Sequence, residues 1–284
     1  MTSPRPHTSP DTSPDTSPYA RAPRGPVPAA VSVLLTDVLD GPVRPWQVVH
    51  RSRCTVHLAR RDDLAAHLCL GTAEAVRLPR TVLVPALPAV GPGDTAYVGG
   101  GGVCCGELRI RPRRWWRPPR PQGLPTPGPS TLRRVRALLG DRCRDGLRDG
   151  LPGRLLDAVP SPDATLDPAA LVGAGPGTTP AGDDVVAGAL VAAHAIADLR
   201  LAGWCAATRT RLDRTTAVSS AMLHDALDGW ATPQLAGFVS AVCRDDDVEA
   251  PLLALLRVGH TSGEACARGA LHVWESAARS GAAA

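Results

Sequence analysis

The sequence predicts an α+β protein, in which a small β-rich domain resembling a barrel or sandwich precedes an all-helical domain. Two observations lead to this fold class. Between residues 29 and 118, short apolar runs alternate with Gly-Pro turns, and from residue 131 onward apolar residues recur at helical spacing. The chain has 284 residues, of which 44% are hydrophobic, so it can fill two cores of modest size.

The first 28 residues repeat Thr-Ser-Pro and have almost nothing apolar to bury, so residues 1–28 are expected to form a disordered tail. This start is polar and lacks the apolar stretch of a signal peptide. No apolar run approaches the roughly 20 residues of a membrane span. We therefore expect a cytoplasmic protein with no membrane partner and with its eight cysteines reduced.

In the β-rich domain, residues 29–118, turn signals such as Gly-Pro and a run of four glycines separate short apolar stretches. Alternation begins at residues 31–35. Further strands are expected at 48–49, 54–58, 76–78, 82–84, 96–98 and 107–110. We expect one short helix, over residues 62–70.

A Pro-rich linker over residues 119–130 separates the two domains, because its proline content favours an exposed, semi-rigid chain. The helical domain then covers residues 131–284. Its first stripe contains Leu132, Val135, Leu138 and Leu139. Asp167-Pro168 and Thr179-Pro180 resemble helix starts, and later stripes lie over 218–227, 252–258 and 265–274. The spacing predicts six to eight helices.

All 31 basic residues are arginines, since the sequence contains no lysine. Enzymes that need a Schiff-base lysine or a P-loop lysine are therefore excluded. The net charge of +4 is too mild to imply nucleic acid by itself.

A glycine-rich stretch over residues 173–184 leads into an expected helix and ends in two aspartates. Backbone amides of such a loop and of a helix start favour an anion. Asp183 and Asp184 would act as a general base or as ligands of Mg²⁺, and Gly188 is expected to leave open space beside Asp184. Helix capping is the structural alternative. The proposed binding residues are Gly175, Gly177, Thr178, Thr179 and Gly182.

A second loop around His260 lies between two expected helices. His260 is the candidate for proton transfer, and Thr261, Ser262 and Gly263 are candidate ligand-binding residues. We expect both loops to lie in one cleft. The structural alternative is a capping box formed by Thr261 and Glu264.

Two further features are weaker. Ser219 falls on the apolar face of its helix, where it either lines a polar cleft or bonds to its own backbone. Six arginines between residues 109 and 120 surround Trp115 and Trp116. This run could bind nucleic acid, although a solvated face or packing between the domains is the favoured interpretation.

Residues 175–184 resemble a signature of the AllH-like bacterial family, with Thr178 and Ala181 in place of Leu and Ser. Residues 259–263 resemble the family's second signature. Ser219 with Leu223 and Ala226 resembles a third block, and Val49-His50 resembles the family's β-rich start. The resemblance covers roughly residues 30–280.

This resemblance implies a subunit of an oxamate carbamoyltransferase in allantoin (purine) catabolism, working with other subunits. The substrate would be a small anion such as carbamoyl phosphate or oxamate, with Mg²⁺ as a possible cofactor at Asp183 and Asp184. Two alternatives remain: a non-catalytic subunit for small-anion binding or assembly, and nucleic-acid binding through the arginine run.

Overall fold

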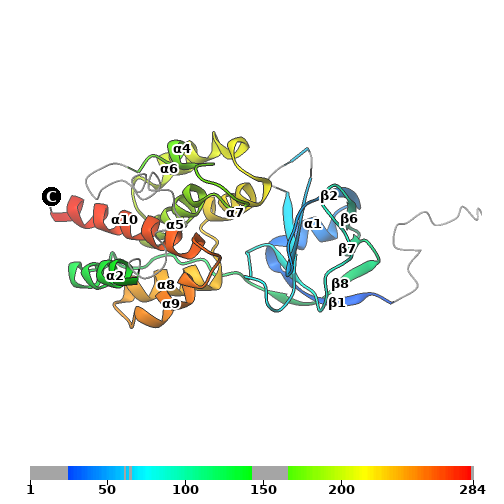
Figure 1. The fold of residues 1–284 in the computed structure, drawn as a ribbon, viewed down its shortest axis with the longest axis horizontal. Coiled ribbons are helices and arrows are strands. Elements are labelled where there is room, and N and C mark those ends of the chain that lie inside the picture. Colours follow the sequence, from blue (N-terminus) through cyan, green and yellow to red (C-terminus); the bar gives the residue numbers. More distant parts are fainter. Residues whose placement is uncertain (1–24, 61, 64–65, 143–165, 283–284) are drawn as a thin grey trace, which may run out of the picture.

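The computed structural model describes residues 25–60, 62–63, 66–142 and 166–282. Most of the expected tail, residues 1–24, lies outside the described residues. The described chain combines a closed eight-stranded barrel with a group of packed helices, which confirms the α+β class (Figure 1).

The barrel strands follow the order β1-β5-β4-β3-β2-β6-β7-β8, and the barrel closes through the parallel pair β1–β8. Alternate side chains point inward, among them Val31, Val48 and Val56, which form a core of their own. Two short helices, η1 (Val33–Leu35) and α1 (Thr36–Asp40), follow the first strand. The strands are β1 (Val27–Ser32), β2 (Arg44–Arg51), β3 (Thr55–Ala59), β4 (His67–Gly71), β5 (Thr81–Leu83), β6 (Thr95–Gly99), β7 (Gly102–Cys105) and β8 (Leu108–Trp116).

Three expectations in this region are corrected. The helix expected over 62–70 is wrong, because β4 occupies its second half and is buried on both faces between β3 and β5. A continuous apolar run of this kind does not distinguish a buried strand from a buried helix. The strand expected at 76–78 does not form, and β1 begins at Val27, inside the expected tail.

Three helices begin at a residue whose side chain caps the first turn. Asp167 caps α4 by accepting a hydrogen bond from the Ala169 amide, and Thr216 and Thr232 cap the helices that follow them. From residue 129 the described helices are α2 (Pro129–Arg142), α4 (Pro168–Leu171), α5 (Ala181–Ile196), α6 (Leu201–Arg209), η2 (Leu212–Arg214), α7 (Ala217–Leu227), α8 (Pro233–Arg244), α9 (Glu249–Leu256) and α10 (Ser262–Ala282).

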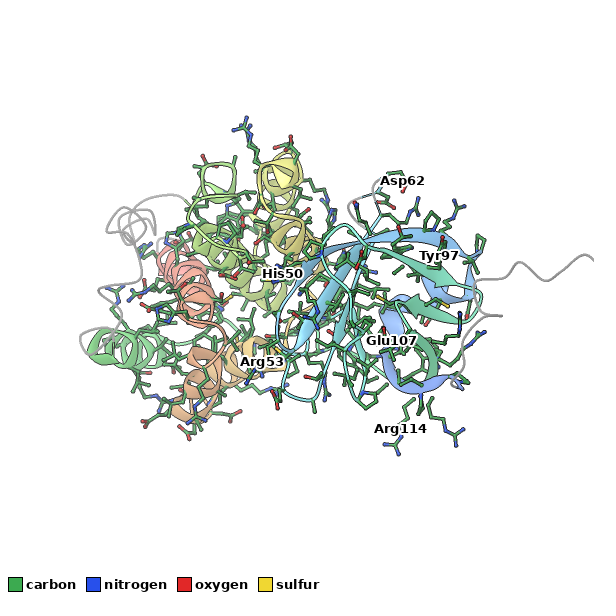
Figure 2. The ribbon with its side chains drawn as sticks, turned by 45° about the vertical axis from the view of Figure 1, so that its right-hand side comes forward. His50, Arg53, Asp62, Tyr97, Glu107 and Arg114 are labelled. Atoms are coloured by element: carbon green, nitrogen blue, oxygen red, sulfur yellow. The ribbon has the colours of Figure 1, made fainter. Side chains whose placement is uncertain are left out.

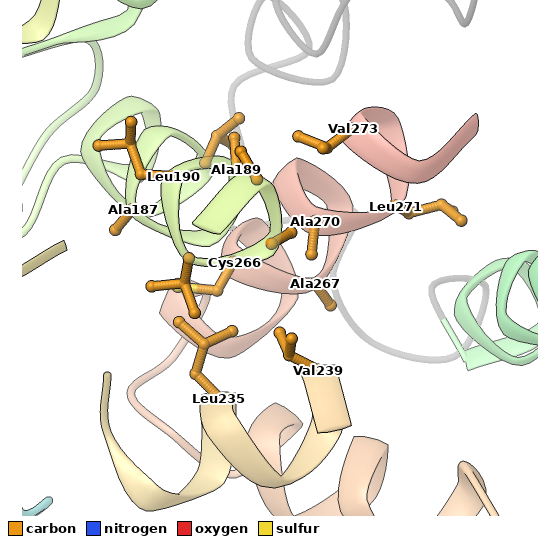
Figure 3. Packing of buried hydrophobic residues seen from close by; sticks show 14 of the residues in the cluster. Ala187, Ala189, Leu190, Leu235, Val239, Cys266, Ala267, Ala270, Leu271 and Val273 are labelled. Atoms are coloured by element: carbon orange, nitrogen blue, oxygen red, sulfur yellow. The ribbon is translucent and has the colours of Figure 1, made fainter. Parts of the chain in front are cut away.

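Helices α5 and α10 cross in direct backbone contact at the centre of the helical core (Figure 3). A Cβ atom on Gly188 would lie 2.0 Å from the Cys266 carbonyl oxygen. A Cβ on Gly269 would lie 2.0 Å from the Val185 carbonyl oxygen. The open space expected beside Gly188 is therefore filled by α10. Both positions need glycine because the backbones of the two helices approach closely.

A buried carboxylate joins the barrel to the helices. Asp225 of α7 is 2% exposed, accepts a hydrogen bond from Arg80 Nε at 2.9 Å, and lies 3.4 Å from His67 Nε2 of β4. Arg80 also donates to the Leu34 carbonyl. These contacts fix the barrel wall that faces α7.

The Pro-rich segment after β8 is also tied to the helices. The Leu124 amide donates to the Ala195 carbonyl, and the Ala231 amide donates to the Pro119 carbonyl. Arg120 in this segment lies over the ring of Trp230. Of the two tryptophans expected to pack between the domains, Trp115 is 44% exposed, whereas Trp116 is half-buried with Arg77 over its ring. No helix in the described part of the chain is both long and apolar enough to cross a membrane.

Gly188→Ala should destabilise the protein by about 3 kcal/mol or more, because the added methyl overlaps the backbone of α10 and the helices must separate. Gly203→Ala is the matched control, since nothing lies within 4 Å of its added Cβ on α6. That change should stabilise by roughly 0.5–1 kcal/mol through helix propensity. Urea unfolding measures both, and equal midpoints would contradict the close-contact interpretation.

Candidate functional site

A cavity of about 380 Å³ lies between the barrel and the helices. It is called the Asp184 cavity here, after the carboxylate in its wall. Figure 2 shows His50, one of its barrel residues, at the boundary between the two parts. The barrel contributes His50, Ser52, Cys54, Thr55, His57, Val76, Leu78 and Pro79. The helical part contributes Thr178, Thr179, Asp184, Ala187, Val191, Val218, Met222, Ala226, Trp230, Ala231, Thr232, Leu235, Leu255, Val258, Gly259, Ser262 and Cys266.

The first loop reaches the cavity through Thr178 and Thr179. Gly173, Gly175 and Gly177 all have positive φ, which lets the chain turn sharply between α4 and α5. Among the proposed binding glycines, Gly175, Gly177 and Gly182 do not line the cavity.

The amides at the start of α5 are largely occupied. The Gly182 amide donates to the Ala174 carbonyl, and the Asp183 amide donates to the Pro180 carbonyl. Thr179 does not cap the helix, since Pro180 occupies the N-cap position without a side-chain bond. The expectation of free amides facing the loop is therefore wrong for these two groups, and the helix start gives little support for anion binding.

Asp183 holds the first loop in place. Its carboxylate accepts hydrogen bonds from the Gly173 amide, at 2.8 Å, and from the Thr215 hydroxyl. Burial raises the pKa of this carboxyl, and the hydrogen bonds from Thr215 and Gly173, together with the nearby Ser219 hydroxyl, oppose the rise. Neither Asp183 nor Ser219 lines the cavity. The geometry supports a structural role for both residues.

Asp184 lies in the cavity wall and is fully buried. Neither carboxylate oxygen has a hydrogen-bond partner of good geometry among the described residues. Burial raises the pKa of Asp184 to about 7; the nearby Ser262 hydroxyl opposes the rise and the Asp183 charge adds to it. Such a carboxyl can donate or accept a proton near neutral pH.

The second loop meets the first at the cavity. Gly259 and Ser262 line it, and the hydroxyls of Ser262 and Thr179 lie 3.4 Å apart. The structure thus brings both loops to one cavity, as expected. However, His260 is exposed and does not line it.

The other residues of the second loop have packing roles. The Thr261 carbonyl accepts a hydrogen bond from the Ala265 amide in the first turn of α10. A Cβ on Gly263 would lie 1.9 Å from the Leu255 carbonyl oxygen, so this glycine allows α9 and α10 to approach. Glu264 pairs with Arg268 one turn further along.

Two barrel histidines line the cavity and were not predicted as site residues. The His50 and His57 rings lie 5.7 Å apart, on neighbouring strands β2 and β3. Burial lowers the pKa of His57 to about 4, with smaller contributions from His50 and His67, so the ring is neutral at physiological pH. Only the alternating pattern of β3 could have indicated that His57 faces the helices.

The described residues offer little for a resident metal ion. They contain no group of three or more His, Cys, Asp or Glu side chains arranged to hold one. Of the two proposed Mg²⁺ ligands, Asp183 already accepts protein hydrogen bonds and only Asp184 reaches the cavity. A cation that prefers six oxygen ligands is poorly served by one carboxylate.

The arginine run is dispersed over the barrel surface. Arg113, Arg114 and Arg117 are exposed, as Figure 2 shows for Arg114, whereas Arg109 contacts Cys104 and Arg111 contacts the Gly100 carbonyl. No arginine is among the residues that line the Asp184 cavity.

The segment that supplies much of the helical wall of the cavity matches a known protein family. Residues 171–274 match the family model described as oxamate carbamoyltransferase subunit AllH. The resemblance read from the sequence is thus confirmed over this segment, which contains both loops, both aspartates and Ser219, and ends within α10. The barrel lies outside the match. No curated protein and no solved structure matches the chain.

Asp184→Asn should change the pH dependence of stability. In the folded protein the pKa of Asp184 is about 7, above its ordinary value of 3.8. Between these two pH values the folded state therefore binds a proton that the unfolded state has lost. The wild type consequently loses stability as pH rises from about 4 to 7. At about 1.4 kcal/mol per pKa unit, the Asn variant should gain a few kcal/mol relative to wild type across this window, with no further gain above it.

Asp183→Asn is the control for this measurement. An Asn amide cannot accept both hydrogen bonds in their present geometry, so the variant should lose about 1–3 kcal/mol at pH 4.5. Because burial also raises the pKa of Asp183, this loss should become smaller as pH rises. Urea unfolding of all three proteins between pH 4.5 and 8.5 provides the test. A difference between Asp184→Asn and wild type that stays constant with pH would contradict the raised pKa.

Proposed function

We propose that this chain is a cytoplasmic subunit of an oxamate carbamoyltransferase-like system, and that the Asp184 cavity binds the amide or carbamoyl group of its substrate. The observation that carries this proposal is the buried carboxyl of Asp184, which has no hydrogen bond of good geometry among the described residues and lies near Ser262, inside the segment that matches the AllH family. A buried carboxyl without a partner is costly, and sites that bind ligands retain such groups.

The chemistry of a carbamoyl group fits this wall. Its N–H₂ group donates two hydrogen bonds and its carbonyl oxygen accepts them. Asp184 can accept from nitrogen when ionised, and the hydroxyls of Ser262 and Thr179 can donate to oxygen. This one wall of the cavity therefore offers a partner to the N–H₂ group and to the carbonyl oxygen of a carbamoyl group.

Asp184 also suits the proton transfer that carbamoylation needs. An acceptor amide nitrogen attacks the carbamoyl carbon, a C–N bond forms, and the C–O bond to the departing phosphate breaks. The nitrogen must then release a proton, which Asp184 takes and passes to the departing phosphate. A base with a pKa near 7 is effective at physiological pH.

A second candidate is a non-catalytic subunit for binding or assembly. It is favoured by the absence of arginine from the cavity lining and by the occupied Gly182 amide. A phosphate leaving group needs positive charge or free amides, which another subunit would then supply.

Turnover with companion subunits distinguishes the two candidates. Carbamoyl phosphate and oxamate, with and without Mg²⁺, are the first substrates to assay. Asp184→Asn should reduce kcat at least a hundredfold if Asp184 transfers the proton, while Asp213→Asn, at an exposed site, should leave kcat unchanged. Full activity of Asp184→Asn in the assembled system would overturn the catalytic role and leave the binding role.

A further inference from the structure

The Asp184 cavity is larger than a carbamoyl group alone requires. Its volume of about 380 Å³ falls within the range of roughly 300–1,000 Å³ that takes drug-sized ligands. Oxamate or carbamoyl phosphate would fill only a small part of it. The remaining space faces the apolar side chains Val191, Met222, Leu235, Leu255 and Val258.

This wall comes from four helices and is not simply the closed core. Met222 and Val258 are half-buried, whereas Leu235 and Leu255 are buried behind them. Water against such a surface has few hydrogen-bond partners, so its displacement by an apolar group is favourable. The wall therefore selects for an apolar body in the ligand.

The polar groups around Asp184 are poorly matched to an anion. Asp184, Thr179 and Ser262 come from the starts of α5 and α10. No arginine lines the cavity, and the buried His57 is neutral. A ligand carboxylate or phosphate placed beside Asp184 would meet a second negative group in a poorly hydrated space, which is costly.

We propose that the Asp184 cavity takes a ligand with an uncharged primary amide or carbamoyl end, held by Asp184, Ser262 and Thr179, and an extended apolar body lying along Met222 and Val258. The choice of an amide rests on the proposed carbamoyl chemistry, while the apolar body rests on the cavity wall alone. The ligand class thus differs from a free small anion.

Four small ligands test the two parts of this proposal, the uncharged amide end and the apolar body, with the wild-type chain. Acetamide and hexanamide differ only in apolar length, and hexanoate and hexylamine carry a negative or positive end on the same body. Calorimetry at pH 8 should show hexanamide binding at least tenfold more tightly than acetamide and than hexanoate. Equal binding of acetamide, or tighter binding of hexanoate or hexylamine, would overturn the proposal.

Two variants locate the binding. Met222→Gln keeps the side-chain length but makes the wall polar, and should weaken hexanamide at least fivefold. Leu199→Gln is the control, because Leu199 is 99% exposed and lies outside the cavity; it should bind as wild type does. Equal losses in both variants would overturn the assigned location. Asp184→Asn should improve hexanoate binding at pH 8 by removing the negative charge.

The transfer assay separates this inference from the proposed function. If hexanamide binds as described but the assembled system transfers no carbamoyl group, the proposed function fails and the ligand class stands. If oxamate is carbamoylated while no amide with an apolar body binds, the ligand class fails and the proposed function stands.

Discussion

The backbone contact between α5 and α10 is the constraint on which the rest of the helical part depends. Two glycines, Gly188 and Gly269, remove the side chains that would otherwise keep these helices a full diameter apart. Because the helices cross so closely, the first turn of α5 and the first turn of α10 lie together. Asp184 and Ser262 meet there, and neither loop could form the cavity wall without the other.

The adjacent aspartates have different roles because successive residues on a helix point about 100° apart. Asp183 faces the loop that precedes α5 and receives two hydrogen bonds. Asp184 faces the cavity and receives none of good geometry from the described residues. One aspartate therefore maintains the loop, and the other is available to a ligand. The same geometry explains why Asp183→Asn disturbs two hydrogen bonds, whereas Asp184→Asn disturbs none of good geometry.

The parts of this structure that depend on local chemistry were predictable from the sequence. Asp167 caps its helix as its proline neighbour indicates, and the leucine stripe of α2 is buried. Features set by distant partners were not predictable. Gly188 has open space only if α10 is ignored, and the 67–71 run is a strand only because two other strands flank it. The cavity itself joins residues far apart in sequence, so the local pattern around His50 and His57 could not identify them as cavity residues.

The barrel supplies the second wall of the Asp184 cavity. The family match covers residues 171–274, which include Asp184 and Ser262, whereas β2, β3 and residues 76–79 complete the cavity from outside the match. The ion pair of Asp225 with Arg80 holds that second wall against α7. Because Asp225 is buried, removing one partner would leave an uncompensated charge and loosen the closure. The size of the cavity therefore depends on the barrel, while its buried carboxylate comes from the helices.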